Sequence, residues 1–185
     1  MVKKSIGIIV GSLRRDSLSK KTALYLSGLL ENSFGVTFIN IGSLAIYNQD
    51  LDSDRDVPVE WRRFRQSISE LDAVLFVTPE YNRSIPPVLK NALDIASRPM
   101  SENAWSGKPG AIVSVGAGRV GGFGVNHHLR QSATCLNIYM MQQPEAYIGG
   151  IADVMDANGV PDKSTQEFLC KFAADFTEWI YKVSV

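Results

Sequence analysis

Residues 5–20 read SIGIIVGSLRRDSLSK, and this stretch decides what the rest of the chain can fold into. Its first part, Ser5 to Val10, is a short apolar run rich in isoleucine, which is typical of a parallel strand covered on both faces. The chain then passes through Gly11 and Ser12 into a segment, from about Ser17 to Glu31, whose apolar residues recur with helical spacing. A strand that turns directly into a helix predicts the first unit of an alternating β–α chain.

The same alternation continues along the chain. Further strands are expected at 36–41, 72–78, 110–115 and 138–141, and further helices at 59–70, 86–97, 122–136 and 161–181. The connections 42–58 and 142–158 are expected to be irregular. This order predicts a single α/β domain over residues 1–185, a flavodoxin-like three-layer αβα sandwich around a five-stranded parallel, doubly wound sheet. In such sheets, ligands bind beyond the carboxyl ends of the strands.

Composition and charge argue against several classes of partner. Of the 185 residues, 45% are hydrophobic and 21% are charged, and 19 basic residues balance 19 acidic ones. This balance disfavours a nucleic-acid-binding or membrane-binding surface. The apolar run after Lys3 and Lys4 is too short for a signal peptide or a membrane span. Cys135 and Cys170 lack metal-site spacing and are expected to be buried free thiols, which fits a cytoplasmic protein.

The loop from Gly11 to Lys20 is suited to binding an anion. Backbone N–H groups at a helix start carry partial positive charge, Ser12, Ser17 and Ser19 add hydroxyl groups, and Arg14 adds a fork that matches phosphate oxygens. The loop has neither the GxxxxGK[ST] pattern of a triphosphatase nor the GxGxxG pattern of a dinucleotide fold, which points toward a mononucleotide. The alternative is that Ser17 only caps the helix and the arginines are solvated.

Two more unusual loops follow strands. Thr78 to Pro87 is stiffened by prolines at both ends, and its backbone groups together with Tyr81 suit the edge and face of a flat heterocycle. Glu80 has a second interpretation there, as a structural hydrogen-bond acceptor. Gly116 to Gly122 holds four glycines, which allow a ligand to approach the backbone closely, although a merely flexible connection is the alternative. Three such loops at strand ends predict one shared site.

The sequence shows no constellation for acid–base or covalent catalysis. His127 and His128 are adjacent, so on a helix they point in different directions, and a structural or interface role is expected for them. No Gly-x-Ser-x-Gly elbow or Cys/His pair is present. We therefore assign no catalytic side chain and no metal ligand.

Several segments together resemble the NADPH-dependent FMN reductase family, in the branch that includes bacterial quinone and chromate reductases. The resemblance covers nearly the whole chain and is carried by Gly11-Ser12-Leu13-Arg14 with Ser17, by Pro79-Glu80-Tyr81-Asn82, by Ile85-Pro86, by Leu89-Lys90-Asn91-Ala92-Leu93-Asp94, and by shorter segments further on. It implies bound FMN, NADPH or NADH as hydride donor, and a small acceptor such as a quinone, free flavin, azo compound or metal oxyanion. It also implies a homodimer or homotetramer.

The resemblance also implies roles for individual residues. Three groups would surround the flavin: Ser12, Arg14, Ser17 and Ser19 at the phosphate, Pro79, Glu80, Tyr81 and Asn82 beside the isoalloxazine, and Ser114, Gly116, Ala117 and Gly118 on its other side. The chain departs from many relatives by placing Lys20 after the serines and Arg83 after Pro-Glu-Tyr-Asn. A non-enzymatic, flavodoxin-like electron carrier is the alternative function, although the neutral charge of this chain is unlike the acidic flavodoxins.

Overall fold

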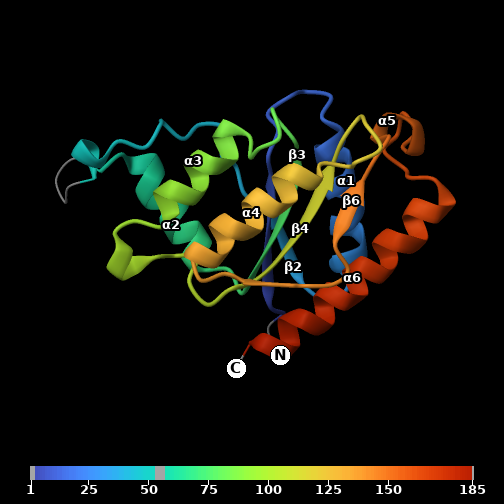
Figure 1. Ribbon diagram of the computed structural model, residues 1–185. Helices are drawn as coiled ribbons and strands as arrows, with labels where there is room; N and C mark the ends of the chain where they lie inside the picture. Colours follow the sequence, from blue (N-terminus) through green and yellow to red (C-terminus); the bar gives the residue numbers. More distant parts are fainter. Residues whose placement is uncertain (1–2, 53–56, 185) are drawn as a thin grey trace.

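The computed structural model describes residues 3–52 and 57–184, and its strands form one parallel sheet (Figure 1). The order along the sheet is β2–β1–β3–β4–β5, and β6 also pairs with β4. This is the doubly wound, flavodoxin-like order, so the predicted fold class is confirmed. The strands are β1 (Ser5–Val10), β2 (Gly35–Phe38), β3 (Ala73–Pro79), β4 (Pro109–Val115), β5 (Tyr139–Met140) and β6 (Ala146–Ile148).

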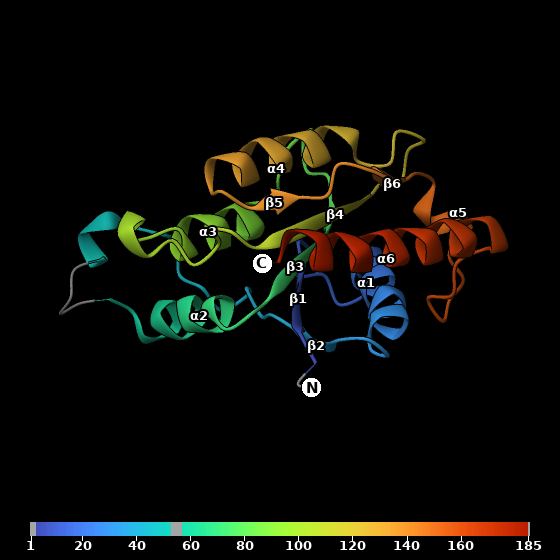
Figure 2. The ribbon, with the colours of Figure 1, turned by 90° about the horizontal axis from the view of Figure 1, so that it is seen from below.

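Helices cover both faces of the sheet (Figure 2). Their apolar sides pack with α1 and α6 on one face and with α2, α3 and α4 on the other. The α-helices are α1 (Leu18–Leu30), α2 (Val59–Ser69), α3 (Pro87–Ala96), α4 (Phe123–Cys135), α5 (Ile151–Val154) and α6 (Lys163–Val183), and two 3₁₀ turns are η1 (Gln49–Leu51) and η2 (Met100–Glu102).

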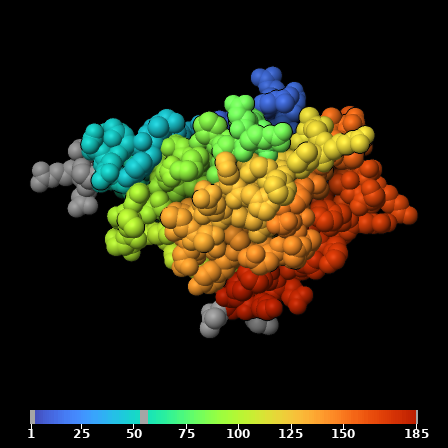
Figure 3. Space-filling view, in the orientation of Figure 1, coloured from blue at the N-terminus to red at the C-terminus, as the bar shows by residue number. Residues whose placement is uncertain are grey.

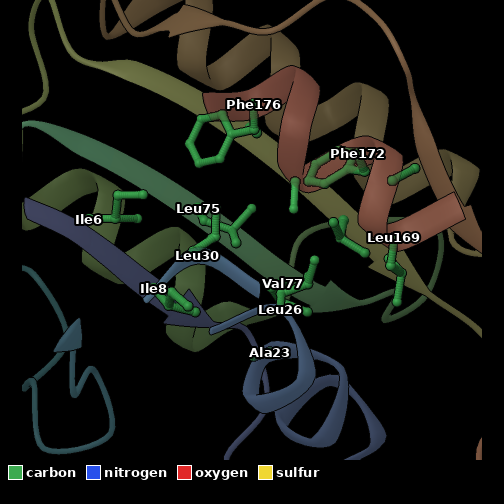
Figure 4. Packing of buried hydrophobic residues seen from close by; sticks show 14 of the residues in the cluster. Ile6, Ile8, Ala23, Leu26, Leu30, Leu75, Val77, Leu169, Phe172 and Phe176 are labelled. Atoms are coloured by element: carbon green, nitrogen blue, oxygen red, sulfur yellow. The ribbon is translucent and has the colours of Figure 1, made fainter. Parts of the chain in front are cut away.

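The central strands are buried on both faces, as their nearly continuous apolar sequences predict. Every residue of β4 is buried, and six of the seven in β3 are. Figure 4 shows the layer on one face, where Leu26 of α1 and Phe172 and Phe176 of α6 converge on Ile8 and Leu75 of the sheet. This packing fixes the position of α1 on the sheet, and the N-terminus of α1 borders the site described below.

The segment 142–158 is not wholly irregular, so that part of the prediction is wrong. It contains β6 and α5, and β6 pairs with β4 from Val113 to Val115 while β5 pairs with Pro109 and Gly110. The two short strands thus occupy a single fifth position of the sheet, one after the other. Three residues carry too little periodicity to be recognised as a strand, and it is the pairing with β4 that forms β6.

Two smaller expectations also differ from the structure. Both Cys135 and Cys170 are exposed, not buried, because they lie on the outer sides of α4 and α6. The last helix begins at Lys163, two residues later than expected, since Asp162 caps it by accepting a hydrogen bond from the Thr165 amide at 2.8 Å. Part of the 42–58 connection, residues 53–56, lies outside the described residues. Among the described helices, none has the length and hydropathy needed to cross a bilayer.

Truncating the α6 packing should cost much of the stability of the fold. Phe176 is fully buried, so Phe176→Ala removes its contacts and leaves a cavity. This should lower the free energy of unfolding by about 3–5 kcal/mol. Glu178→Ala, at an exposed position two residues away, is the control and should stay within about 0.5 kcal/mol of the wild type. Urea unfolding measures both; equal effects would contradict the packing described here.

Candidate functional site

Three loops meet at the carboxyl edge of the sheet and border one cavity of about 170 Å³. They follow β1, β3 and β4, and Figure 3 shows these blue, green and yellow segments side by side at the top of the molecule. The cavity lies at the β1–β3 position, where the strand order reverses. Nine of the twelve residues predicted for the site line it: Ser12, Arg14, Ser17, Ser19, Pro79, Glu80, Tyr81, Gly116 and Ala117.

The first loop presents the start of α1 to the cavity. Ser17 is the N-cap, and its hydroxyl accepts a hydrogen bond from the Lys20 amide at 3.1 Å, so Ser17 does cap the helix while it also lines the cavity. The cap pairs with one N–H group of the first turn. The other N–H groups at a helix start have no partner within the helix and remain able to bind a ligand. Leu18 and Ser19 line the cavity, and the first turn of α1 carries no acidic residue. This end of α1 can therefore receive an anion.

The first loop is pressed against the end of β3. The Gly11 amide donates to the Val77 carbonyl at 2.9 Å, and a Cβ atom at Gly11 would collide with the side chain of Thr78. Only glycine permits this approach. The contact places Ser12 and Arg14 directly beside the second loop, and the amide of Arg14 also reaches the Ser12 hydroxyl at 3.4 Å.

The second loop makes a tight two-residue turn. Tyr81 and Ser84 exchange backbone hydrogen bonds of 3.1 and 2.9 Å, and the residues between them, Asn82 and Arg83, have φ angles of 51° and 65°. Positive φ at both central positions is the type I′ geometry of a hairpin turn. Pro79, Glu80 and Tyr81 line the cavity, whereas Asn82 lies at the tip of the turn and does not.

Glu80 fastens this turn to α4. Its Oε2 accepts a hydrogen bond from the Val125 amide at 3.0 Å, which supports the structural interpretation of Glu80, and the same residue also lines the cavity. Gly124 makes the contact possible, because a Cβ atom there would lie 2.8 Å from Glu80 Oε2 and 2.9 Å from the Arg83 carbonyl oxygen. A second connection joins Ser84 Oγ to His128 Nδ1 at 3.0 Å.

The third loop is joined by backbone hydrogen bonds to the start of α5. The amide of Gly150 donates to the Gly118 carbonyl at 3.2 Å, and that of Ile151 donates to the Gly116 carbonyl at 3.1 Å. Gly116 and Ala117 line the cavity, while Gly118 lies outside its lining. Ile151 of α5 completes the cavity wall. It lies in the segment 142–158, which is expected from the sequence to be irregular. Leu18 and Val115 also line the cavity and were not predicted. The one sequence feature that could have indicated them is that each is adjacent to a predicted residue.

Ser114 does not line the cavity either. It is fully buried, its hydroxyl donates to the Ala146 carbonyl at 3.2 Å, and it accepts from Asn126 Nδ2 at 3.3 Å. Asn126 in turn accepts from Arg130 Nε at 3.0 Å. Ser114 therefore ties β4 to β6 and α4 beneath the third loop, so it supports the site from below.

The histidines take part in packing and hydrogen bonding, as expected of a structural role. His127 Nε2 lies 3.1 Å from the Tyr147 hydroxyl, and its ring centroid is 4.2 Å from that of Phe123. Burial and the neighbouring Glu145 carboxylate raise the pKa of Tyr147 to about 12. Tyr147 therefore stays a neutral hydroxyl group at physiological pH.

A larger hollow, of about 510 Å³, lies elsewhere, between α6 and the chain just after β5. Its wall includes Trp179 and Lys171, the latter paired with Asp175 at 2.6 Å. It lies away from the carboxyl edge where doubly wound sheets bind ligands. We therefore assign the functional site to the smaller cavity, where three strand-end loops, a helix N-terminus and an arginine converge.

Comparison with known proteins agrees with the geometry. Residues 5–153 match the family described as NADPH-dependent FMN reductase. A quinone reductase of Pseudomonas putida is 48% identical over 95% of this chain and 94% of its own length. A 2-hydroxy-1,4-benzoquinone reductase of a Burkholderia species is 45% identical, covering 95% of each chain. The structure of FerB, a flavoenzyme NAD(P)H:(acceptor) oxidoreductase of Paracoccus denitrificans, superposes with a TM-score of 0.91 at 39% identity, over 98% of this chain and all of FerB.

Two glycine-to-alanine changes in helices should shift stability in opposite directions. Gly28→Ala, in exposed space on α1, should raise the unfolding free energy by about 0.5–1 kcal/mol through helix propensity. Gly124→Ala should instead lower it by about 1–3 kcal/mol, because the new methyl group meets Glu80 and the Arg83 backbone. Chemical denaturation compares the two variants. Stabilisation by Gly124→Ala would show that the turn is not held against α4 as described.

Proposed function

This chain belongs to the NADPH-dependent FMN reductase family, and from that premise we propose that it is a flavoenzyme that passes a hydride from NAD(P)H through FMN to a small acceptor. The single observation that supports this function best is the cavity at the strand-order reversal. One helix N-terminus, one arginine and two further loops converge there. FMN occupies this position in the flavodoxin-like sheet order.

The residues present fit FMN. The phosphate group is matched by the start of α1, by the hydroxyl groups of Ser12, Ser17 and Ser19, and by the guanidinium of Arg14. Buried hydroxyls beside a helix start with no acidic residue in its first turn are a donor set for a dianion. Tyr81 on one side and the Gly116–Ala117 backbone on the other leave a slot for a flat ring.

Bound FMN supplies the hydride chemistry, and the protein supplies binding and orientation. The cavity of about 170 Å³ is smaller than the ~300–1,000 Å³ of typical ligand pockets, so we infer that part of the flavin ring projects beyond it. The exposed part of the ring would be the place where NAD(P)H delivers its hydride and where the acceptor then receives it. The rigid loops hold the ring in place, and no side chain is assigned a proton-transfer role.

We propose a quinone as the acceptor class. Support comes from the relatives named as quinone reductases over nearly their whole length. Free flavin, azo compounds and metal oxyanions remain further candidates for the same open site. The family of enzymes to which the chain belongs argues against the alternative of a non-enzymatic electron carrier, which would bind FMN yet fail to oxidise NADPH with a quinone present.

We also propose a homodimer or homotetramer in the cytoplasm, where unpaired Cys135 and Cys170 stay reduced. An exposed apolar cluster on α4 and the loop before it supports self-association. Val120 and Phe123 are 56% and 50% exposed, and Phe123 packs only against His127 and Tyr147 of the same surface among the described aromatic contacts. Light scattering on the purified chain at micromolar concentration tests this, and a monomer would contradict it.

Removing the Arg14 guanidinium should weaken FMN binding. Arg14→Ala loses a charged phosphate contact worth about 1.5–3 kcal/mol, which raises the dissociation constant about ten- to a hundredfold. Arg15→Ala is the matched control, because Arg15 is also exposed and lies in the same loop but does not line the cavity. Fluorescence titration of the apoprotein with FMN measures both, and an unchanged affinity in Arg14→Ala would refute the assigned role.

A further inference from the structure

The three loops around the cavity carry five basic residues against two acidic ones, Asp16 and Glu80, although the chain as a whole has no net charge. Arg14 lines the cavity beside the serines and is accounted for by the FMN phosphate. Arg83 on the second loop and Arg119 on the third remain without a function. Glu80, the acidic residue in the cavity wall, already accepts from the Val125 amide. The Glu80 carboxylate keeps its negative charge in that hydrogen bond, so the three loops together carry an excess of positive charge of three.

Arg83 stands where the backbone disfavours it. The second central position of a type I′ turn favours glycine, and Arg83 adopts a φ of 65° there. A non-glycine residue in this region is strained, and such strain concentrates at ligand-binding positions. The hydrogen bond from the Val125 amide to Glu80 and the close approach of the turn to Gly124 hold the turn against α4 in this shape. The strained position therefore points to a use for the arginine side chain.

The guanidinium of Arg83 is largely exposed and makes one weak ion pair. Its Nη1 lies 3.5 Å from Glu80 Oε1, so it lies close to a residue of the cavity wall, yet the side chain is 78% exposed. An ion pair this exposed is weak. The exposed guanidinium can therefore turn toward an anion that binds outside the cavity, beside the Tyr81–Ser84 turn.

We propose that Arg83 binds the 2′-phosphate of NADPH and thereby makes this enzyme prefer NADPH over NADH; the proposal rests on the function proposed above. Tyr81 lines the cavity and Arg83 lies two residues further on in the same turn, so a dinucleotide bound over the cavity would have this turn beside it. The 2′-phosphate is a terminal dianion whose free oxygens suit a bidentate guanidinium fork. The diphosphate bridge, which NADH also carries, offers less charge for each phosphate.

The test compares Arg83→Gly with Arg119→Ala, both in the full-length, FMN-loaded protein with a quinone acceptor. Glycine is chosen because it relieves the positive φ, so the turn is retained while the fork is lost. We expect KM for NADPH to rise about ten- to a hundredfold in Arg83→Gly, with kcat, the NADH parameters and FMN affinity unchanged. Arg119→Ala should leave the ratio of NADPH to NADH kcat/KM as in the wild type.

A binding measurement provides a readout that does not depend on turnover. Calorimetry should show that adenosine 2′,5′-bisphosphate binds the wild type more tightly than AMP does, and that Arg83→Gly abolishes the difference. Three results would overturn the proposal: equal losses for NADPH and NADH, which indicate a contact with the diphosphate; no change in either; or the effect appearing in Arg119→Ala. A wild-type protein that takes up no FMN would instead overturn the proposed function itself.

Discussion

The close contact between Gly11 and Thr78 is the constraint on which the site depends. It brings the start of α1, with its free amide groups, beside the end of β3, and the Gly11 amide is bonded to Val77. Any larger residue at position 11 would push the first loop away from the second. The helix N-terminus and the ring-binding loop would then no longer share one cavity. The packing of α1 and α6 on the sheet holds the helix start at that place.

A second constraint comes from α4. Its first turn receives Glu80 and leaves room for the Arg83 backbone only because residue 124 is glycine. The loop that borders the proposed flavin ring is therefore positioned by a helix on one face, and the phosphate-binding loop by a helix on the other. The cavity proposed to hold the flavin is thus built by both layers of helices, with the sheet fixing the distance between them. In the proposed function, loops held in this way would orient the cofactor, which supplies the hydride chemistry.

Much of this arrangement is predictable from the sequence. The continuous apolar runs and the glycine- and proline-rich strand ends predict the sheet class and the three loops, and the family resemblance points to nine of the residues that line the cavity. The rest depends on contacts between distant segments. β6 exists because β4 offers an edge, Ser114 is turned inward by Asn126 and Ala146, and Asn82 is carried to the tip of a turn. The exposure of Cys135 and Cys170 depends on how each helix is rotated, which an apolar surrounding sequence does not settle.

The central claim is that the cavity holds FMN which NAD(P)H reduces and a quinone reoxidises. The most direct measurement is the visible absorption spectrum of the FMN-reconstituted protein under anaerobic conditions, recorded before NADPH, after NADPH, and after a benzoquinone. The account predicts a flavin spectrum that bleaches with NADPH and returns with the quinone. A protein that stays colourless after reconstitution, or a bound flavin that NADPH and NADH both fail to bleach, would contradict it.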